Sequence, residues 1–163
     1  MGATEPPRPG IVAGIDGSPS SLAALEWAAR QADLTGSALV VVAAWRLPST
    51  YPETGTFDDY DPAAEMQRVL DNSLPAIHRS HPTLELTGQV IEGHPGPVLV
   101  DASRDADLLV VGSRGHGEFA DILLGSVGVH CATHAHCPVL VHRFDRAQAV
   151  TAATSAAREP ATS

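Results

Sequence analysis

The chain has 163 residues, of which 44% are hydrophobic and only 4% aromatic, so its length suits a single domain with an aliphatic core. Its formal charge is -9, with 19 acidic against 10 basic residues. This balance argues against nucleic-acid binding, which requires clustered Lys and Arg. The sequence contains no lysine, which excludes both a phosphate-binding lysine and a Schiff-base lysine.

The cysteine content and the hydropathy pattern bear on the compartment. Cys131 and Cys137 are the two cysteines, and we do not favour a disulfide between them, so we expect a reducing environment. The sequence has no run of about 18 apolar residues, and we therefore expect no membrane segment and a cytoplasmic protein. Residues 1–9 are rich in proline and predict a disordered leader, and residues 145–163 predict a disordered tail. The domain is expected over residues 10–144.

Apolar runs and helical repeats alternate along the first half of the domain. Residues 11–15 predict a buried strand, and Ser18-Pro19 begins a helix that runs to about residue 34. Residues 37–45 are apolar without alternation, which indicates a strand covered on both faces. Residues 46–61 contain prolines and aspartates and predict a surface loop. A plain insertion is favoured for this loop over a lid that closes on a ligand.

The second half repeats the pattern. A helix opens at Pro62, contains Pro75 and ends near His81, and a strand follows over residues 86–91. The remaining elements are predicted as a helix over 97–105, a strand over 107–111, a helix over 119–135 and a strand over 138–142. Strict alternation over five strands predicts an α/β fold, with an open parallel sheet and helices on both faces. Such sheets bind ligands at the carboxyl ends of their strands.

A glycine-rich segment follows the fourth predicted strand. It reads Gly112-Ser113-Arg114-Gly115, and Gly125-Ser126 comes nine residues later. Glycines permit close approach of the backbone to an anion, and amides at a helix N-terminus can hold a phosphate. The hydroxyl of Ser126 could add a donor. Phosphate binding is therefore favoured over a purely structural turn.

This spacing resembles the G-2x-G-9x-G-(S/T) signature of ATP-binding members of the universal stress protein family. Similar residues also occur at 14–18, at Ala44-Trp45, at Gly93 and Pro95, and at 137–141, so the resemblance covers about residues 10–143. It implies a Rossmann-like fold with strand order 3-2-1-4-5. It also implies an adenine-nucleotide ligand, ATP with or without Mg²⁺, and a stress-response role exerted through nucleotide-dependent association.

The resemblance assigns roles to individual residues. Ile15 and Ala44 would line the adenine, and Asp16 would lie near the ribose, although an aspartate in this turn could equally bond its own backbone. Arg114 would add charge to the phosphates or point to solvent. The full set of predicted binding residues is Ile15, Asp16, Ala44, Gly112, Arg114, Gly115, Gly125 and Ser126. ATP-binding relatives commonly carry a second hydroxyl at the position of Gly128, which makes the preference for ATP over shorter nucleotides an open question.

Histidines and cysteines gather between residues 130 and 137. His130 and His134 share one helical face, but Cys131 is expected on the buried face and Cys137 precedes a strand. These four groups would not converge without distortion, so core cysteines and solvated histidines are favoured and no metal site is predicted. His94 and His116 fall near the predicted site without an assigned role.

The catalytic and assembly predictions complete the hypothesis. No arrangement of a nucleophile with a base is found, so no enzymatic activity beyond slow ATP hydrolysis is expected. The apolar edge at residues 139–141 predicts a homodimer through the fifth strand, alongside an unidentified protein partner. Two alternatives stay open: a nucleotide-free interaction module of the same fold, and a slow ATP hydrolase or nucleotide transferase.

Overall fold

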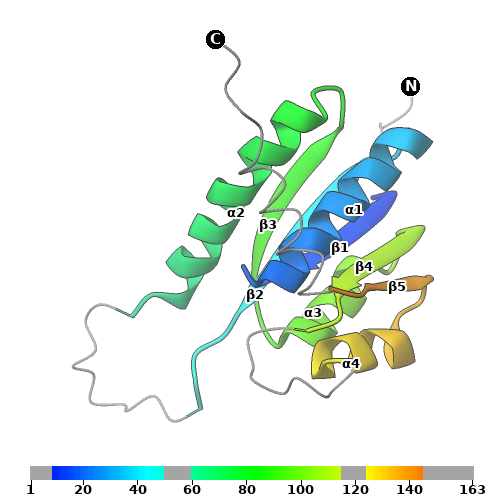
Figure 1. The fold of residues 1–163 in the computed structure, drawn as a ribbon. Helices are drawn as coiled ribbons and strands as arrows, with labels where there is room; N and C mark the ends of the chain where they lie inside the picture. The colour runs from blue at the N-terminus through cyan, green and yellow to red at the C-terminus, as the bar shows by residue number, and fades with distance from the viewer. Residues whose placement is uncertain (1–8, 50–59, 115–123, 145–163) are drawn as a thin grey trace, which may run out of the picture.

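The computed structural model describes residues 9–49, 60–114 and 124–144. Its strands are β1 (Ile11–Ile15), β2 (Leu39–Trp45), β3 (Leu86–Glu92), β4 (Leu108–Gly112) and β5 (Val139–His142) (Figure 1). They form one sheet in the order β3-β2-β1-β4-β5, and every pair of neighbouring strands is parallel. The connecting helices are α1 (Pro19–Thr35), α2 (Pro62–Ser80), α3 (Pro95–Ala102) and α4 (Ser126–His134). The predicted fold class and strand order are confirmed.

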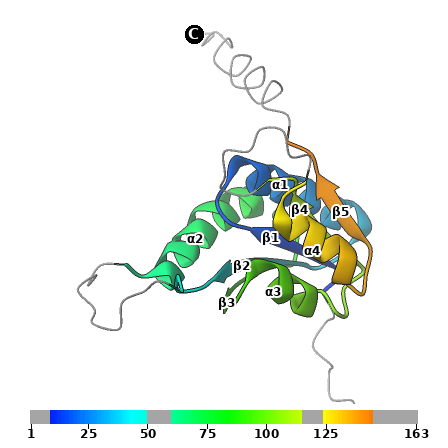
Figure 2. The ribbon, with the colours of Figure 1, turned by 90° about the horizontal axis from the view of Figure 1, so that it is seen from below.

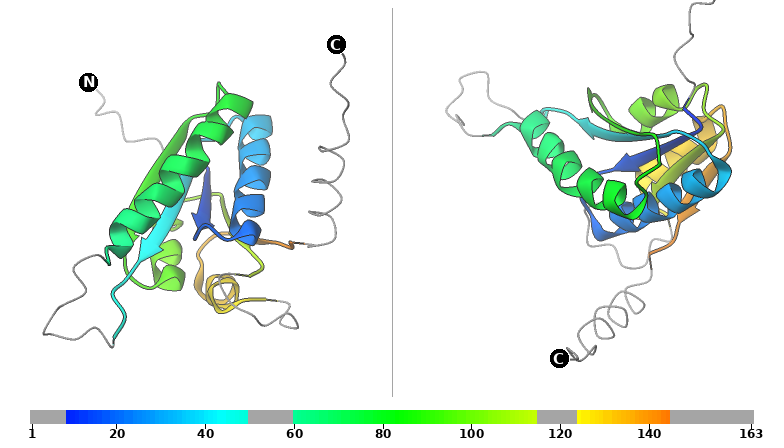
Figure 3. Two further views of the ribbon diagram at one scale, coloured as in Figure 1. Left: turned by 60° about the vertical axis from the view of Figure 1, so that its left-hand side comes forward. Right: turned by 90° about the horizontal axis from the view of Figure 1, so that it is seen from above.

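Helices cover both faces of the sheet, as the unbroken apolar strands require. Figure 2 shows α1 and α2 on one side and α3 and α4 on the other. Figure 3 shows α1 and α2 lying side by side. Along β1, Ile11, Ala13 and Ile15 pack with the first pair of helices, whereas Val12 faces the second pair. The core therefore consists of two layers separated by the sheet.

Capping fixes the start and the end of α1. The hydroxyl oxygen of Ser18 accepts a hydrogen bond from the backbone N–H of Ser21 at 3.2 Å, and Pro19 occupies the first helical position. Gly36 ends the helix with a φ of 66°, a left-handed conformation that favours glycine. The predicted start is confirmed, and the helix extends one residue beyond the predicted end. The longer helix α2 continues through Pro75, which lacks an N–H and so leaves one helical hydrogen bond unmade.

Two predicted helices have the wrong bounds. α3 begins at Pro95 rather than residue 97, because proline is tolerated in the first turn of a helix, where no N–H is needed. It ends at Ala102 rather than residue 105. The helix predicted over 119–135 begins at Ser126, because Gly125 is extended with φ -70° and ψ 165°. Its C-terminal residue is His134. Residues 119–123 of that prediction lie outside the described residues.

Several predictions concern segments that the structure does not describe. Residues 50–59, which make up most of the loop predicted over 46–61, lie outside the described residues. So do residues 1–8 of the predicted leader and residues 145–163, the predicted tail. Among the described helices, none combines the length and the hydropathy needed to span a bilayer.

Candidate functional site

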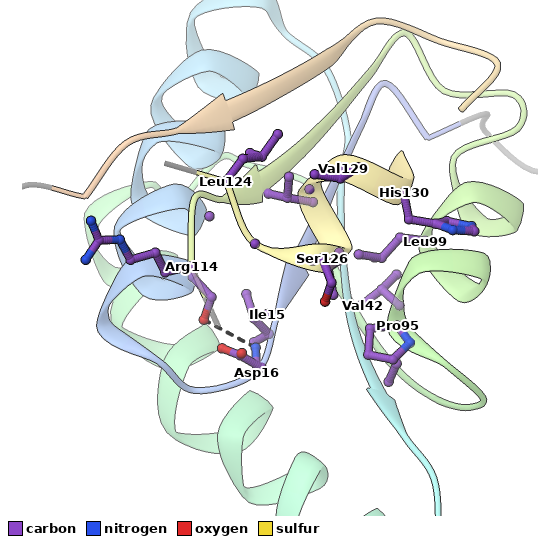
Figure 4. A pocket seen from close by; sticks show the side chains of 18 of the residues that line it. Ile15, Asp16, Val42, Pro95, Leu99, Arg114, Leu124, Ser126, Val129 and His130 are labelled. Carbon is purple, nitrogen blue, oxygen red and sulfur yellow. Dashed lines mark hydrogen bonds between the residues drawn. The ribbon is translucent and has the colours of Figure 1, made fainter. Parts of the chain in front are cut away.

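A cavity of about 890 Å³ opens at the carboxyl ends of β1, β2 and β4. β1 and β4 are neighbours in the sheet, and the chain leaves them toward opposite edges, so their ends define the switch point where such folds form a crevice. Helices α3 and α4 complete the wall (Figure 4). The structure brings seven of the eight predicted residues to this cavity: Ile15, Asp16, Ala44, Gly112, Arg114, Gly125 and Ser126. The eighth, Gly115, lies outside the described residues.

Asp16 is held by the first turn of α1. Its Oδ1 accepts a hydrogen bond from the backbone N–H of Ser18 at 2.9 Å, and its own N–H donates to Oγ of Ser21 at 3.2 Å, which is the bond dashed in Figure 4. The Ser21 hydroxyl in turn donates to the carbonyl of Ser18 at 3.0 Å. The local turn that the sequence suggested for Asp16 is therefore present, and it holds the residue at the cavity wall.

Close packing against α1 fixes the end of β4. A Cβ at Gly112 would lie 2.7 Å from Oγ and 2.8 Å from the carbonyl carbon of Ser20, so glycine alone fits there. The backbone N–H of Arg114 donates to the same Ser20 hydroxyl at 3.3 Å. The segment after β4 is joined to the start of α4, because the N–H of Gly125 donates to the carbonyl of Ser113 at 2.8 Å. The glycine-rich segment is thus anchored at both of its described ends.

The N-terminus of α4 faces the cavity, and no side chain of the described residues caps it. Gly125 is the N-cap residue and makes no side-chain hydrogen bond to the helix. The first amides of a helix need partners, and a phosphate is a suitable one because the helix dipole is positive at this end. Ser126 is exposed, and Figure 4 shows its hydroxyl directed into the space between Asp16 and Pro95. This arrangement provides amides and a hydroxyl for an anion.

The opposite wall is apolar. Ile15, Val42, Ala44 and Leu99 line it, with Pro95 at its rim. Such a surface suits a flat hydrophobic ring system. Val42 was not predicted, although it lies two residues before Ala44 and therefore on the same face of β2. Leu99 could not be found this way, because it reaches the site from α3 through tertiary packing.

The sequence left the direction of the Arg114 side chain open and assigned no role to the nearby histidines. Figure 4 shows the Arg114 side chain directed away from Asp16 and Ser126, and the residue is exposed. His94 is the N-cap residue of α3 and is not among the residues that line the cavity. His116 lies outside the described residues. The histidines that do line the wall are His130 and His134 of α4.

Leu124 and Gly128 together shape the wall beside Ser126. A Cβ at position 128 would lie 2.8 Å from Cδ1 of Leu124. The Leu124 side chain therefore occupies the space beside Gly128 into which a longer side chain would project. An apolar group thus lies beside the position at which the resemblance in sequence implies a second hydroxyl.

The cysteines are not neighbours of the cavity. Cys131 is completely buried in the core between the sheet and α3, which confirms its predicted position, and Cys137 is half-buried. Burial, and secondarily the charge of Cys137, raise the pKa of the Cys131 thiol to about 11. Among the described residues, no group of three or more His, Cys, Asp or Glu side chains is placed to hold a metal ion.

Comparison with known proteins gives consistent matches. A model of the universal stress protein family matches residues 9–143. Universal stress protein Rv2624c of Mycobacterium tuberculosis is 36% identical over 143 residues, which cover 87% of this chain and 51% of that protein. The chain spans about half the length of the curated relatives that it matches.

Solved structures with a similar fold include two nucleotide complexes. A universal stress protein in complex with cAMP has 27% identity and a TM-score of 0.60, over 80% of this chain and 94% of that one. The universal stress protein from Archaeoglobus fulgidus in complex with dAMP has 25% identity and a TM-score of 0.60. The latter match covers 81% of this chain and 95% of that chain.

Proposed function

The chain belongs to the universal stress protein family, and from this premise we propose that it binds an adenine nucleotide in the cavity at the ends of β1, β2 and β4. The observation that carries the proposal is the meeting of seven predicted residues around one cavity beside the uncapped N-terminus of α4. The similar structures that hold cAMP and dAMP support it.

Three regions of the cavity suit the adenine, the ribose and the phosphate of a nucleotide. The adenine would lie against the apolar wall of Ile15, Val42 and Ala44. The ribose would lie near Asp16, whose carboxylate accepts hydrogen bonds from hydroxyls. The phosphate would bind at the start of α4, where amides and the Ser126 hydroxyl take the place of the absent lysine.

The proposed physiological ligand is ATP, with or without Mg²⁺, whose charge would offset that of the phosphates. The proposed output is a change in association with a second copy or another protein, as part of a cytoplasmic stress response. Catalysis forms no part of the proposal. The position of Leu124 beside Gly128 bears on how many phosphates of the nucleotide the site can bind, because the phosphates beyond the first would meet an apolar side chain there.

Calorimetric titration of the full chain tests this proposal. Adenosine, AMP, cAMP, ATP and ATP with Mg²⁺ are compared, and we expect saturable binding of at least one phosphorylated ligand. Ser126→Ala should weaken the binding of phosphorylated ligands by about 10- to 150-fold, since hydrogen bonds to charged groups contribute about 1.5–3 kcal/mol. Adenosine, which has no phosphate, should bind both proteins equally.

Thr35→Ala is the matched control, because it removes a hydroxyl that does not line the cavity. This hydroxyl donates to the carbonyl of Gln31 at 2.9 Å and belongs to the last residue of α1. We expect it to leave nucleotide affinity unchanged. Absence of heat and of any thermal shift with all the ligands would refute nucleotide binding, and equal losses in the two variants would refute the assigned position of the phosphate.

A nucleotide-free interaction module is the second candidate, and the apolar cover of Leu124 over Gly128 is the observation that favours it. Native mass spectrometry of gently purified protein separates the two hypotheses. A co-purified adenine nucleotide would contradict the hypothesis of a nucleotide-free interaction module.

A further inference from the structure

Ser113, the residue after β4, is polar and yet buried, with 4% of its surface exposed. Its neighbours in the sequence, Gly112 and Arg114, both line the cavity, whereas Ser113 is not among the residues that do so. The proposed nucleotide would therefore have no direct contact with Ser113. Because a polar group is buried only when its hydrogen bonds are made, the partners of Ser113 indicate what it does.

Three segments of the chain meet at Ser113 through hydrogen bonds. Its backbone N–H donates to the carbonyl of His142, the last residue of β5, at 2.9 Å. Its backbone carbonyl accepts from the N–H of Gly125, the N-cap residue of α4, at 2.8 Å. Its hydroxyl oxygen accepts from the backbone N–H of Phe144 at 3.3 Å. One residue thus connects the end of β4, the start of α4 and the chain that leaves β5.

The bond to Phe144 is the weakest of the three. The two backbone bonds have lengths within the usual range of about 2.7–3.2 Å, whereas the bond to Phe144 is longer than that range. Phe144 also lies two residues beyond His142, where the pairing of β4 with β5 ends. This bond therefore opens more easily than the other two, and it is sensitive to how firmly Ser113 is held.

The bond between Ser113 and Gly125 connects this junction to the proposed phosphate site. Gly125 and Ser126 line the cavity, and the amides at the start of α4 are the proposed phosphate ligands. A phosphate bound there restrains Gly125 and, through the 2.8 Å bond, Ser113. A restrained Ser113 holds its hydroxyl in place for Phe144. Because coupling between two sites is reciprocal, the bond to Phe144 strengthens phosphate binding by the same factor.

We propose that Ser113 is a positioning residue of the phosphate site, whose hydroxyl couples phosphate binding at α4 to the position of Phe144 after β5. The inference rests on the proposed function, and it adds a physical route from the nucleotide to the edge of the sheet. This route consists of hydrogen bonds between described residues and requires no contact between Ser113 and the ligand.

Ser113→Ala tests the role of the hydroxyl, because it removes that group and leaves both backbone bonds in place. Calorimetry of the full chain compares adenosine, AMP and ATP. We expect AMP and ATP to bind the variant about 2- to 10-fold more weakly than the wild type, the contribution of one neutral hydrogen bond. Adenosine, which has no phosphate at α4, should bind both proteins equally.

Ser103→Ala is the matched control. Ser103 is also fully buried, its hydroxyl donates to the carbonyl of Val100 at 3.2 Å, and it does not line the cavity. The control therefore removes a buried, hydrogen-bonded hydroxyl that has no link to α4. We expect it to bind all three ligands like the wild type.

Hydrogen exchange of the wild type, followed by NMR, tests the coupling without any substitution. Saturation with the tighter of AMP and ATP should slow exchange of the Phe144 N–H by about 2- to 10-fold, and adenosine should leave it unchanged. A wild type that binds none of the ligands would refute the proposed function and this inference together. With a wild type that binds, the inference alone is overturned by unchanged affinity in Ser113→Ala, by an equal loss in Ser103→Ala, or by exchange at Phe144 that phosphorylated ligands do not slow.

Discussion

The two cysteines lie six residues apart in the sequence but differ in their chemistry. Cys131 is fully buried, and burial raises the pKa of its thiol to about 11, so almost no reactive thiolate forms near neutral pH. Cys137 is half-buried before β5. We expect iodoacetamide at pH 8 to modify Cys137 in the native protein and Cys131 only after unfolding. Mass spectrometry of the intact protein checks this, with Cys137→Ser as the control that should stay unmodified; equal native rates at both positions would contradict it.

A substitution at position 128 tests how many phosphates of the nucleotide the site binds. In Gly128→Ser the new Cβ would lie 2.8 Å from Cδ1 of Leu124, the far end of a flexible side chain that can rotate away. We therefore expect the variant to fold with a melting temperature near that of the wild type. Because the new hydroxyl adds a donor beside Ser126, the ratio of ATP affinity to AMP affinity should rise by about tenfold.

The control for this prediction is Gly128→Ala, which moves Leu124 in the same way but adds no donor. Calorimetry with ATP and AMP measures the ratio for all three proteins. An increase of the same size in the alanine variant would assign the effect to Leu124 rather than to the hydroxyl, and no increase in either would contradict the proposed position of the outer phosphates.

Site residues at strand ends were predicted through the resemblance to a family. Ile15, Asp16 and Ala44 were assigned in this way, and their places at or after the ends of apolar runs agree with it, because parallel strands bring their carboxyl ends to one edge. Leu99 and His130 reach the same cavity from helices, and their positions depend on how α3 packs against α4. No periodicity in the sequence encodes that contact, so these residues appeared only in the structure.

Among the strands, β5 contains a histidine, His142, with a buried ring nitrogen. Nδ1 of His142 is buried and finds no hydrogen-bond partner within the part of the chain that is described. Burial, and then the Arg30 guanidinium of α1, lower the pKa of the His142 imidazole below its ordinary value. The folded state therefore favours the neutral ring. Its stabilising contribution is complete above the unfolded value of about 6.5 and is lost as the pH falls from there through the folded pKa.

His142→Leu should change both the size and the pH dependence of stability. Removal of the unpartnered nitrogen should raise the free energy of unfolding at pH 7.5 by about 1 kcal/mol. Removal of the titrating ring should also reduce the loss of stability between pH 7.5 and pH 5. Urea denaturation at several pH values measures both effects. His136→Leu, at an exposed position, should keep the wild-type slope, and a wild-type slope in His142→Leu would show that other groups cause the pH dependence.

Element types followed from the sequence, whereas the bounds of two helices, α3 and α4, did not. The alternation of apolar runs and helical repeats specified strands and helices, because both faces of the sheet must be covered. The start of α4 depends instead on the extended backbone of Gly125, which is joined to Ser113 by a hydrogen bond of 2.8 Å. That contact forms only after β4 and α4 meet, so the local sequence does not mark it.

Across the whole molecule, the order of the strands decides where the site lies. The apolar pattern predicted a parallel sheet, but the order 3-2-1-4-5 came from the resemblance to a family rather than from periodicity. Once β1 and β4 are neighbours, the crevice between their ends follows from the directions in which the chain leaves them. The same order leaves β3 and β5 at the two edges of the sheet.

Among the described strands, β5 pairs on one side only, with β4. The N–H of Leu109 donates to the carbonyl of Pro138, and the N–H of Ser113 donates to that of His142. Because backbone groups alternate along a strand, those of Val139 and Val141 point away from β4. An edge of this kind favours pairing, and two copies related by a twofold axis would use it in the same way. The predicted homodimer is therefore testable at Val141.

Val141→Pro removes an outward N–H without removing a bond to β4, since proline lacks this donor. We expect the wild type to be dimeric in size-exclusion chromatography with light scattering, and Val141→Pro to be monomeric while its circular dichroism is unchanged. Val141→Ala loses a similar amount of packing but keeps the N–H, so it should remain dimeric. A monomeric wild type over the whole concentration range would refute the dimer, and a dimeric proline variant would place the interface elsewhere on the molecule.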